Sequence, residues 1–170
     1  MALLVAVVVV AAGFDWRIRR IPNALNFAGI GAGLLLWLVA GSIRELLFAF
    51  GAAVAVIAAG MVLQAAGILG GGDVKLLGAV AAIGGPGFLG EALFWTVVAG
   101  VVASMVILSR HRALLPLFRR LGGVARAALW RLEPEEPLIE GEGHRMPYGV
   151  VIAVGCVLAV IAGRAGVSVL

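Results

Sequence analysis

The sequence of 170 residues is poor in charge and in cysteine. Only 13% of its residues are charged, and 63% are hydrophobic. A soluble domain is about a quarter charged and about half apolar, so this composition predicts an integral membrane protein. Cys156 is the single cysteine, which excludes a disulfide within the chain and a CxxC zinc site. The net charge of +4 reflects arginine-rich loops, as in membrane proteins, and we predict no nucleic acid partner.

Residue types that bind metals or carry charge in catalysis are also scarce. The two histidines, His111 and His144, have no partner at the spacing of metal ligands, so we predict no metal and no cofactor. The chain has two aspartates, Asp15 and Asp73, and both lie where an apolar segment meets polar residues. An ionised side chain inside a bilayer is costly, which makes these acids candidates for function.

Six apolar segments predict an all-α membrane protein, a bundle of six transmembrane helices that residues 1–170 form as a single domain. The segments are residues 1–14, 24–42, 46–69, 74–84, 92–109 and 150–163. The first segment is not a signal peptide, because its arginines follow the apolar run instead of preceding it. We therefore expect a retained helix with its N-terminus outside, and Asp15 within or just below its last turn.

The connections carry signals for caps, breaks and close packing. Pro22 opposes helix continuation, and Asn23 is expected to cap the next helix. The Gly-Gly-Pro-Gly run at residues 84–87 is expected to end the fourth helix. Gly29 and Gly33 form a GxxxG pair, which favours close helix packing but also arises by chance in a glycine-rich chain.

The largest polar region, residues 110–145, contains an amphipathic stretch followed by an acidic one. On a helical wheel the apolar residues share one face and the arginines lie opposite, which predicts an interfacial amphipathic helix in a large cytoplasmic loop. We interpret this helix as a linker, with a platform at the mouth of the site as the alternative. The apolar face holds Leu114, Leu117, Phe118, Leu121, Ala125, Ala128, Leu129 and Leu132, and the opposite face holds Arg112, Arg119 and Arg126.

The basic residues predict the orientation in the membrane. Under six spans, all of the 13 Lys and Arg residues except Arg44 and Arg164 fall on one side. Loops rich in Lys and Arg stay in the cytoplasm, so we expect a multi-pass protein of the inner (plasma) membrane with its N-terminus outside. Asp15 and Asp73 then lie together at the cytoplasmic face, although they come from different loops.

Asp73 follows three glycines, 70–72, and precedes Lys75 by two residues. Glycine lets another backbone approach the acid. Two carboxyl groups can hydrolyse a peptide when one is ionised and activates water while the other is protonated and polarises the scissile carbonyl. A helix N-terminus favours the anion at Asp73, whereas a shared proton favours one neutral acid, so the holder of the proton stays open.

Three motifs resemble those of the type IV prepilin peptidases, the GxGD membrane aspartic peptidases. Residues 15–23 (DWRIRRIPN) are similar to the first aspartate motif of that family, and residues 70–77 (GGGDVKLL) to its GxGD motif. Residues 146–155 (MPYGVVIAVG) are similar to the proline–aromatic–glycine motif that begins its last helix. Order and spacing agree over nearly the whole chain.

The resemblance implies an aspartic endopeptidase that removes the short basic leader of prepilins, with the prepilin and membrane lipids as its partners. The glycines would admit an extended substrate beside Asp73, and Lys75 would meet lipid headgroups or, alternatively, tune the acid. The matching residues are Asp15 and Asp73 for catalysis, and Gly70, Gly72, Lys75, Pro147, Tyr148 and Gly149 for substrate binding and the entrance.

One feature departs from the full family pattern. Larger members begin with a cytoplasmic segment bearing paired CxxC motifs and methylate the new N-terminus; this sequence has neither motif, so we predict cleavage without methylation.

The alternative to a peptidase is a non-enzymatic membrane scaffold or a small proton-coupled carrier. A carrier would place its acids near the middle of the membrane, and a scaffold would tolerate the loss of either aspartate.

Overall fold

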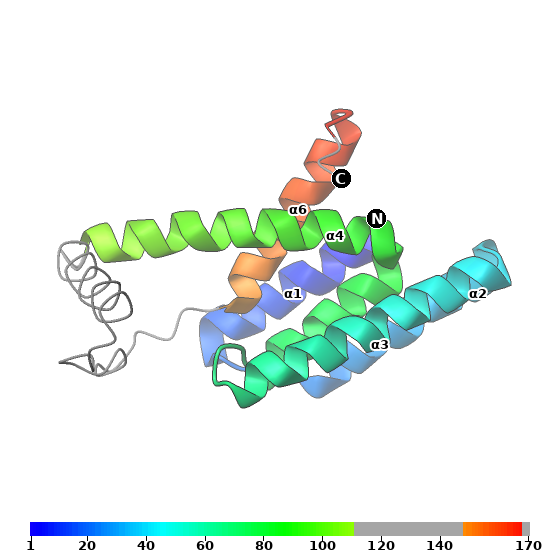
Figure 1. The fold of residues 1–170 in the computed structure, drawn as a ribbon, viewed down its shortest axis with the longest axis horizontal. Helices are drawn as coiled ribbons and strands as arrows, with labels where there is room; N and C mark the ends of the chain where they lie inside the picture. The colour runs from blue at the N-terminus through cyan, green and yellow to red at the C-terminus, as the bar shows by residue number, and fades with distance from the viewer. Residues whose placement is uncertain (111–147, 168–170) are drawn as a thin grey trace, which may run out of the picture. The chain divides into compact units, whose positions relative to one another are not determined.

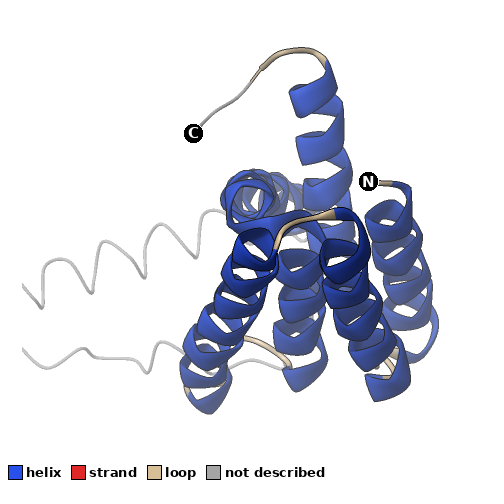
Figure 2. Ribbon diagram, turned by 90° about the vertical axis from the view of Figure 1, so that its right-hand side faces the viewer, coloured by secondary structure: helices blue, strands red, loops and turns tan. Residues whose placement is uncertain are grey.

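The computed structural model describes residues 1–110 and 148–167, and all regular structure in them is helical (Figure 2). This confirms the predicted all-α class for the described part of the chain. The predicted interfacial helix and acidic loop lie outside the described residues. The helices are α1 (Ala2–Ile18), α2 (Asn23–Ala40), α3 (Ile43–Ala65), α4 (Gly71–Arg110) and α6 (Tyr148–Arg164) (Figure 1).

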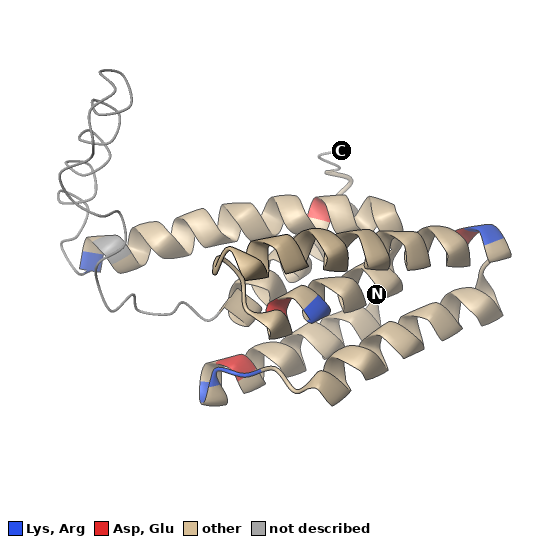
Figure 3. Ribbon diagram, turned by 60° about the horizontal axis from the view of Figure 1, so that its bottom comes forward, with Lys and Arg blue, Asp and Glu red and all other residues tan. Residues whose placement is uncertain are grey.

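Residues 1–100 and 148–167 belong to one compact unit, and residues 101–110 belong to a second. Three helices are long and apolar enough to cross a membrane: Asn23–Ala40, Ile43–Ala65 and Gly71–Ile107. Long stretches of ribbon carry no charged residue (Figure 3). Outward-facing side chains such as Val39 and Val62 are 83% and 70% exposed, and apolar surface of this kind suits lipid rather than water. These are the features of a multi-pass membrane protein.

The ends of α2 and α3 are fixed by local hydrogen bonds. The expected cap at Asn23 is wrong, because Pro22 takes the N-cap position with an extended backbone and no side chain caps the helix. At the start of α3, Ser42 and Glu45 form a capping box, in which each side chain accepts a hydrogen bond from the other residue's backbone N–H. At its end, Gly67 has a φ of 74°, which only glycine adopts freely.

A break divides α4 at Gly85, whose φ of 74° and ψ of 178° are not helical. Pro86 follows and supplies no backbone N–H for a helical hydrogen bond. The break predicted at residues 84–87 is therefore confirmed. Inside the fold, the Trp37 indole N–H donates to the Ala82 carbonyl at 3.1 Å, which fixes α2 beside this end of the first segment of α4.

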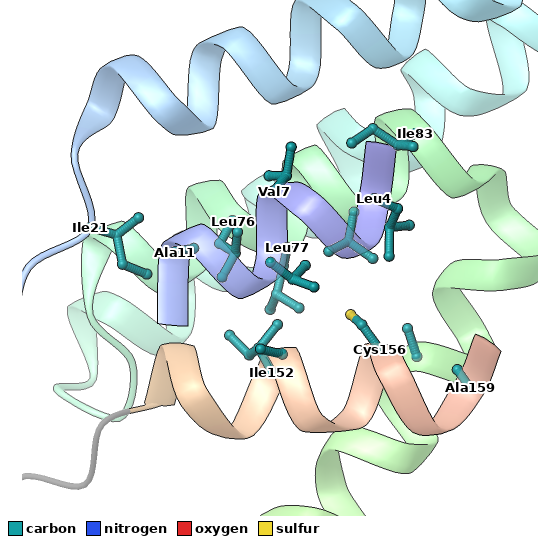
Figure 4. Close-up of a cluster of buried hydrophobic side chains, with 14 residues drawn as sticks. Leu4, Val7, Ala11, Ile21, Leu76, Leu77, Ile83, Ile152, Cys156 and Ala159 are labelled. Carbon is teal, nitrogen blue, oxygen red and sulfur yellow. The ribbon is translucent and has the colours of Figure 1, made fainter. Parts of the chain in front are cut away.

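The first segment of α4, residues 71–84, is the central helix of its unit, and residues 76–83 are all buried. Apolar side chains of α1 and α6 cover one side of it (Figure 4). Ala53 of α3 packs on another side, against Ala81 and Ala82, with side chains of α2 alongside. A helix that is apolar all round is expected to be enclosed in this way. Asp73 stands in the first turn of this central helix.

The GxxxG pair of α2 packs directly against the central helix. A Cβ atom added to Gly33 would lie 2.7 Å from the backbone carbonyl carbon of Ala82, and one added to Gly29 would lie 3.1 Å from the Cβ of Ala79. Both glycines are buried. Close packing, rather than chance, therefore explains this pair, and it sets the position of α2 relative to the helix that carries Asp73.

Candidate active site

Asp15 lies in the last turn of α1 and is only 8% exposed. The helix ends at Arg19, whose left-handed backbone (φ 50°) turns the chain away from the helix axis. The Arg19 N–H donates to the Asp15 carbonyl at 3.0 Å and completes this turn. The prediction that Asp15 lies within the end of the first helix is confirmed.

The start of α6 meets the Asp15 side chain. The Gly149 N–H donates a buried hydrogen bond of 2.8 Å to Asp15 Oδ2. Gly149 is the second residue of α6, and the first N–H groups of a helix have no partner within it, so the carboxylate satisfies one of them. A Cβ at Gly149 would come within 2.9 Å of the same oxygen. Glycine is thus needed here for space, and its contact is with an acid.

Asp73 stands close enough to Asp15 for the two carboxyl groups to interact electrostatically. Gly70 adjoins it, because a Cβ at Gly70 would lie 2.8 Å from Asp73 Oδ2. The fold therefore brings together two acids that are far apart in sequence, one from α1 and one from α4. Two carboxyl groups in one site can supply the acid and the base that peptide hydrolysis requires.

Ile21, a residue of the first motif, packs against Gly72 and Gly149 of the other two motifs. It was not predicted as a site residue. It is 8% exposed and lies just beyond the end of α1 (Figure 4). A Cβ at Gly72 would lie 3.3 Å from the Ile21 Cβ, and one at Gly149 would lie 3.0 Å from its Cδ1. The signal in the sequence is an apolar residue within an otherwise polar connection, directly before a proline.

Two side chains tie the start of α2 to the start of α4. The Asn26 side-chain N–H donates to the Gly72 carbonyl at 3.1 Å, and the Lys75 ammonium donates to Asn23 Oδ1 at 2.9 Å. Lys75 Nζ also lies 5.6 Å from the centre of the Phe27 ring. Asn26 is fully buried and was missed in the sequence, although it shares a helix face with the two packing glycines of α2.

The predicted site residues differ in where the structure places them. Asp15, Asp73, Gly70, Gly72 and Gly149 are brought together. Tyr148, 40% exposed, begins α6 beside them, Lys75 is engaged with α2, and Pro147 lies outside the described residues. In the part of the chain that the structure describes, no group of three or more His, Cys, Asp or Glu side chains could hold a metal ion. The chemistry that these residues offer is general acid–base catalysis by two carboxyl groups.

The chain matches the model of a known protein family. No curated protein and no solved structure matches the chain. The model of the type IV leader peptidase family matches residues 2–105. The matched range contains Asp15, Asp73 and the whole central helix, and it agrees with the resemblance inferred from the motifs. Because it covers more than half of the 170 residues, the protein belongs to the type IV leader peptidase family.

Proposed function

We propose that this protein is an aspartic endopeptidase that removes the N-terminal leader of type IV-like prepilins at the cytoplasmic face of the inner membrane. The observation that carries the proposal is the meeting of Asp15 and Asp73, the two aspartates of the chain, beside the first turns of α4 and α6. A scaffold or a proton-coupled carrier has no need for two acids at one end of a helix bundle.

In the proposed reaction one carboxyl group acts as the general base and the other as the general acid. The ionised acid takes a proton from a water molecule, whose oxygen attacks the scissile carbonyl carbon. The protonated acid donates its proton to the carbonyl oxygen. When the resulting gem-diol intermediate collapses, the carbon–nitrogen bond breaks and the leaving nitrogen takes the proton that the first acid removed from water, while a hydroxyl of the intermediate returns a proton to the second acid. The Gly149 N–H supports this cycle by holding Asp15 in one orientation at 2.8 Å.

The proposed substrate site lies along the glycines before Asp73. Gly70 and Gly72 carry no side chain between the acid and an approaching peptide, so an extended backbone can come close. Tyr148 and Gly149, with Pro147 before them, would shape the entrance. The apolar helix that follows a prepilin leader would remain in the lipid during cleavage, and Lys75 would stand near the headgroups. In this proposal the chain spans the membrane six times as one peptidase domain.

The assay that tests the proposal uses the purified protein in lipid vesicles with a prepilin from the same genome. Asp15→Asn and Asp73→Asn should each lower leader cleavage to near background, because water activation and carbonyl protonation are both required. The double variant should be little worse than either single one, since residues that act as a unit are not additive. Mass spectrometry should find the product unmethylated in the presence of S-adenosylmethionine, in keeping with the single cysteine of these 170 residues.

The matched control is Glu45→Gln. It also removes one acid from a helix end, and glutamine can still form the capping box with Ser42. Cleavage should stay at the wild-type rate. Substantial cleavage by either aspartate variant, at equal amounts of folded protein, would exclude the aspartic mechanism and favour a scaffold. A methylated product would exclude peptidase-only activity.

A further inference from the structure

We propose that Asn26 is a positioning residue of the active site. Its amide holds the Gly72 carbonyl, and so fixes the first turn of α4 that carries Asp73. The effect expected on cleavage rests on the proposed function; the effect expected on the turn itself does not.

The segment that Asn26 holds consists of glycines, and two backbone hydrogen bonds from Asp73 and Val74 to the Gly70 carbonyl close its turn. Residues 70–72 are all glycine, and glycine is the residue with the most backbone conformations to lose. Gly72 directly precedes Asp73, so a shift of its peptide unit moves the carboxyl group. The 3.1 Å bond from Asn26 Nδ2 joins this peptide to a different helix. The turn is therefore tied at the residue next to the acid.

The helix that provides the bond cannot easily move. Gly29 and Gly33 lie on the same face of α2 as Asn26, at helical spacing, and both pack against the backbone or Cβ atoms of α4. Asn26 is 0% exposed, so its amide has no water-filled alternative position. The tie from Lys75 to Asn23, by contrast, is exposed, and water can replace it.

The oxygen of the Asn26 side-chain amide indicates that Asn26 does not serve to stabilise the fold. Within the described residues, the buried Oδ1 atom has no hydrogen-bond donor. A buried acceptor without a partner disfavours the folded state, whereas an apolar side chain of similar shape would avoid the penalty. A residue that only filled space here would be better as leucine. The amide is explained if its donor is needed at the Gly72 carbonyl.

The test compares Asn26→Leu, which keeps the volume and removes the donor, with the wild-type protein in lipid vesicles. Hydrogen exchange of residues 70–77, read by mass spectrometry, should become several-fold faster, because the Leu76 amide pairs with the Gly72 carbonyl in a helix. With a prepilin substrate, kcat should fall about tenfold or more, since small displacements of a reacting group are costly. KM should stay within about twofold, because binding contacts remain, and the melting temperature should be unchanged or higher.

The control is Trp37→Phe, which removes the donor of another side-chain hydrogen bond from α2 to a backbone carbonyl of α4, at Ala82 and away from the turn. It should lower the melting temperature and leave both kcat and the exchange of residues 70–77 unchanged. If Asn26→Leu does not fold, Asn26→Ala removes the same donor and leaves a small cavity. Unchanged exchange at residues 70–77 in the folded variant would overturn the proposal. A wild-type protein that cleaves no prepilin would overturn the proposed function, and the exchange measurement would still decide the role of Asn26.

Discussion

At the scale of single residues, the site depends on glycines, which leave space beside the acids, as much as on its polar side chains. Gly149→Ala would put a Cβ 2.9 Å from Asp15 Oδ2 and 3.0 Å from Ile21 Cδ1. One of these groups must shift, and both are buried. We expect the Asp15 carboxyl group to turn away from Asp73, and leader cleavage to fall by about tenfold to a hundredfold.

The control for this prediction lies on the same helix. Gly163→Ala meets nothing within 4 Å, so it should leave cleavage unchanged and stabilise α6 by about 0.5–1 kcal/mol, the usual gain of alanine over glycine inside a helix. Cleavage rates per folded molecule and melting temperatures in detergent would be measured for both variants. Equal activity of the two would mean that the Gly149 contact with Asp15 has no part in the reaction.

The sequence predicts the two acids of the site better than the residues that position them. Asp15 and Asp73 stand out because aspartate is rare in this chain and both flank apolar segments. Their partners give weaker signals: an isoleucine such as Ile21 looks like any core residue, and the sequence does not say what Asn26 touches. Asn23 was expected to cap α2, yet it accepts a bond from Lys75, because the fold brings α4 to that side chain and Pro22 takes the cap position.

At the scale of elements, hydrophobic runs and breakers predict most helices, whereas packing partners depend on contacts between distant segments. The run from residue 150 to 163 corresponds to α6, and the break at 84–87 corresponds to the kink at Gly85. Apolar character alone does not say that the first segment of α4 is enclosed and that α3 is largely exposed. The GxxxG pair indicates a contact but not its partner, which the structure identifies as the central helix.

The contact between α2 and α4 can be tested with two glycines of the same helix. A Cβ at Gly33 would lie 2.7 Å from backbone atoms of Ala82 that cannot turn aside, whereas a Cβ at Gly31 would meet nothing within 4 Å. Gly33→Ala should destabilise the protein by about 1–3 kcal/mol, as overpacking does. Gly31→Ala should instead stabilise it slightly, by about 0.5–1 kcal/mol. Thermal unfolding in detergent measures both, and a stabilising Gly33→Ala would contradict close packing at this helix crossing.

At the scale of the whole molecule, the described helices place the acids and the α2–α3 connection far apart. The start of α2 is bonded to Gly72 through Asn26, and the end of α3 returns there, since Gln64 lies about 3.1 Å from where a Cβ of Gly71 would stand. Residues 41 and 42 join the other ends of these two helices. An 18-residue helix is about 27 Å long, close to the thickness of a membrane core. The aspartates and Ser42 should therefore lie on opposite sides.

This arrangement, together with the arginine distribution, predicts the orientation, with Asp15 and Asp73 in the cytoplasm and Ser42 outside. Single cysteines at Ile43 and Glu136 in a Cys156→Ala background would be treated with an impermeant thiol reagent in intact cells. Ile43 is 67% exposed and adjoins the cap without belonging to it, so its replacement leaves the Ser42–Glu45 bonds in place. The reagent should label position 43 and leave position 136 unlabelled until the cells are opened. The reverse pattern would show that the protein has the opposite orientation, with the aspartates outside the cell, where no uncleaved cytoplasmic leader could reach them.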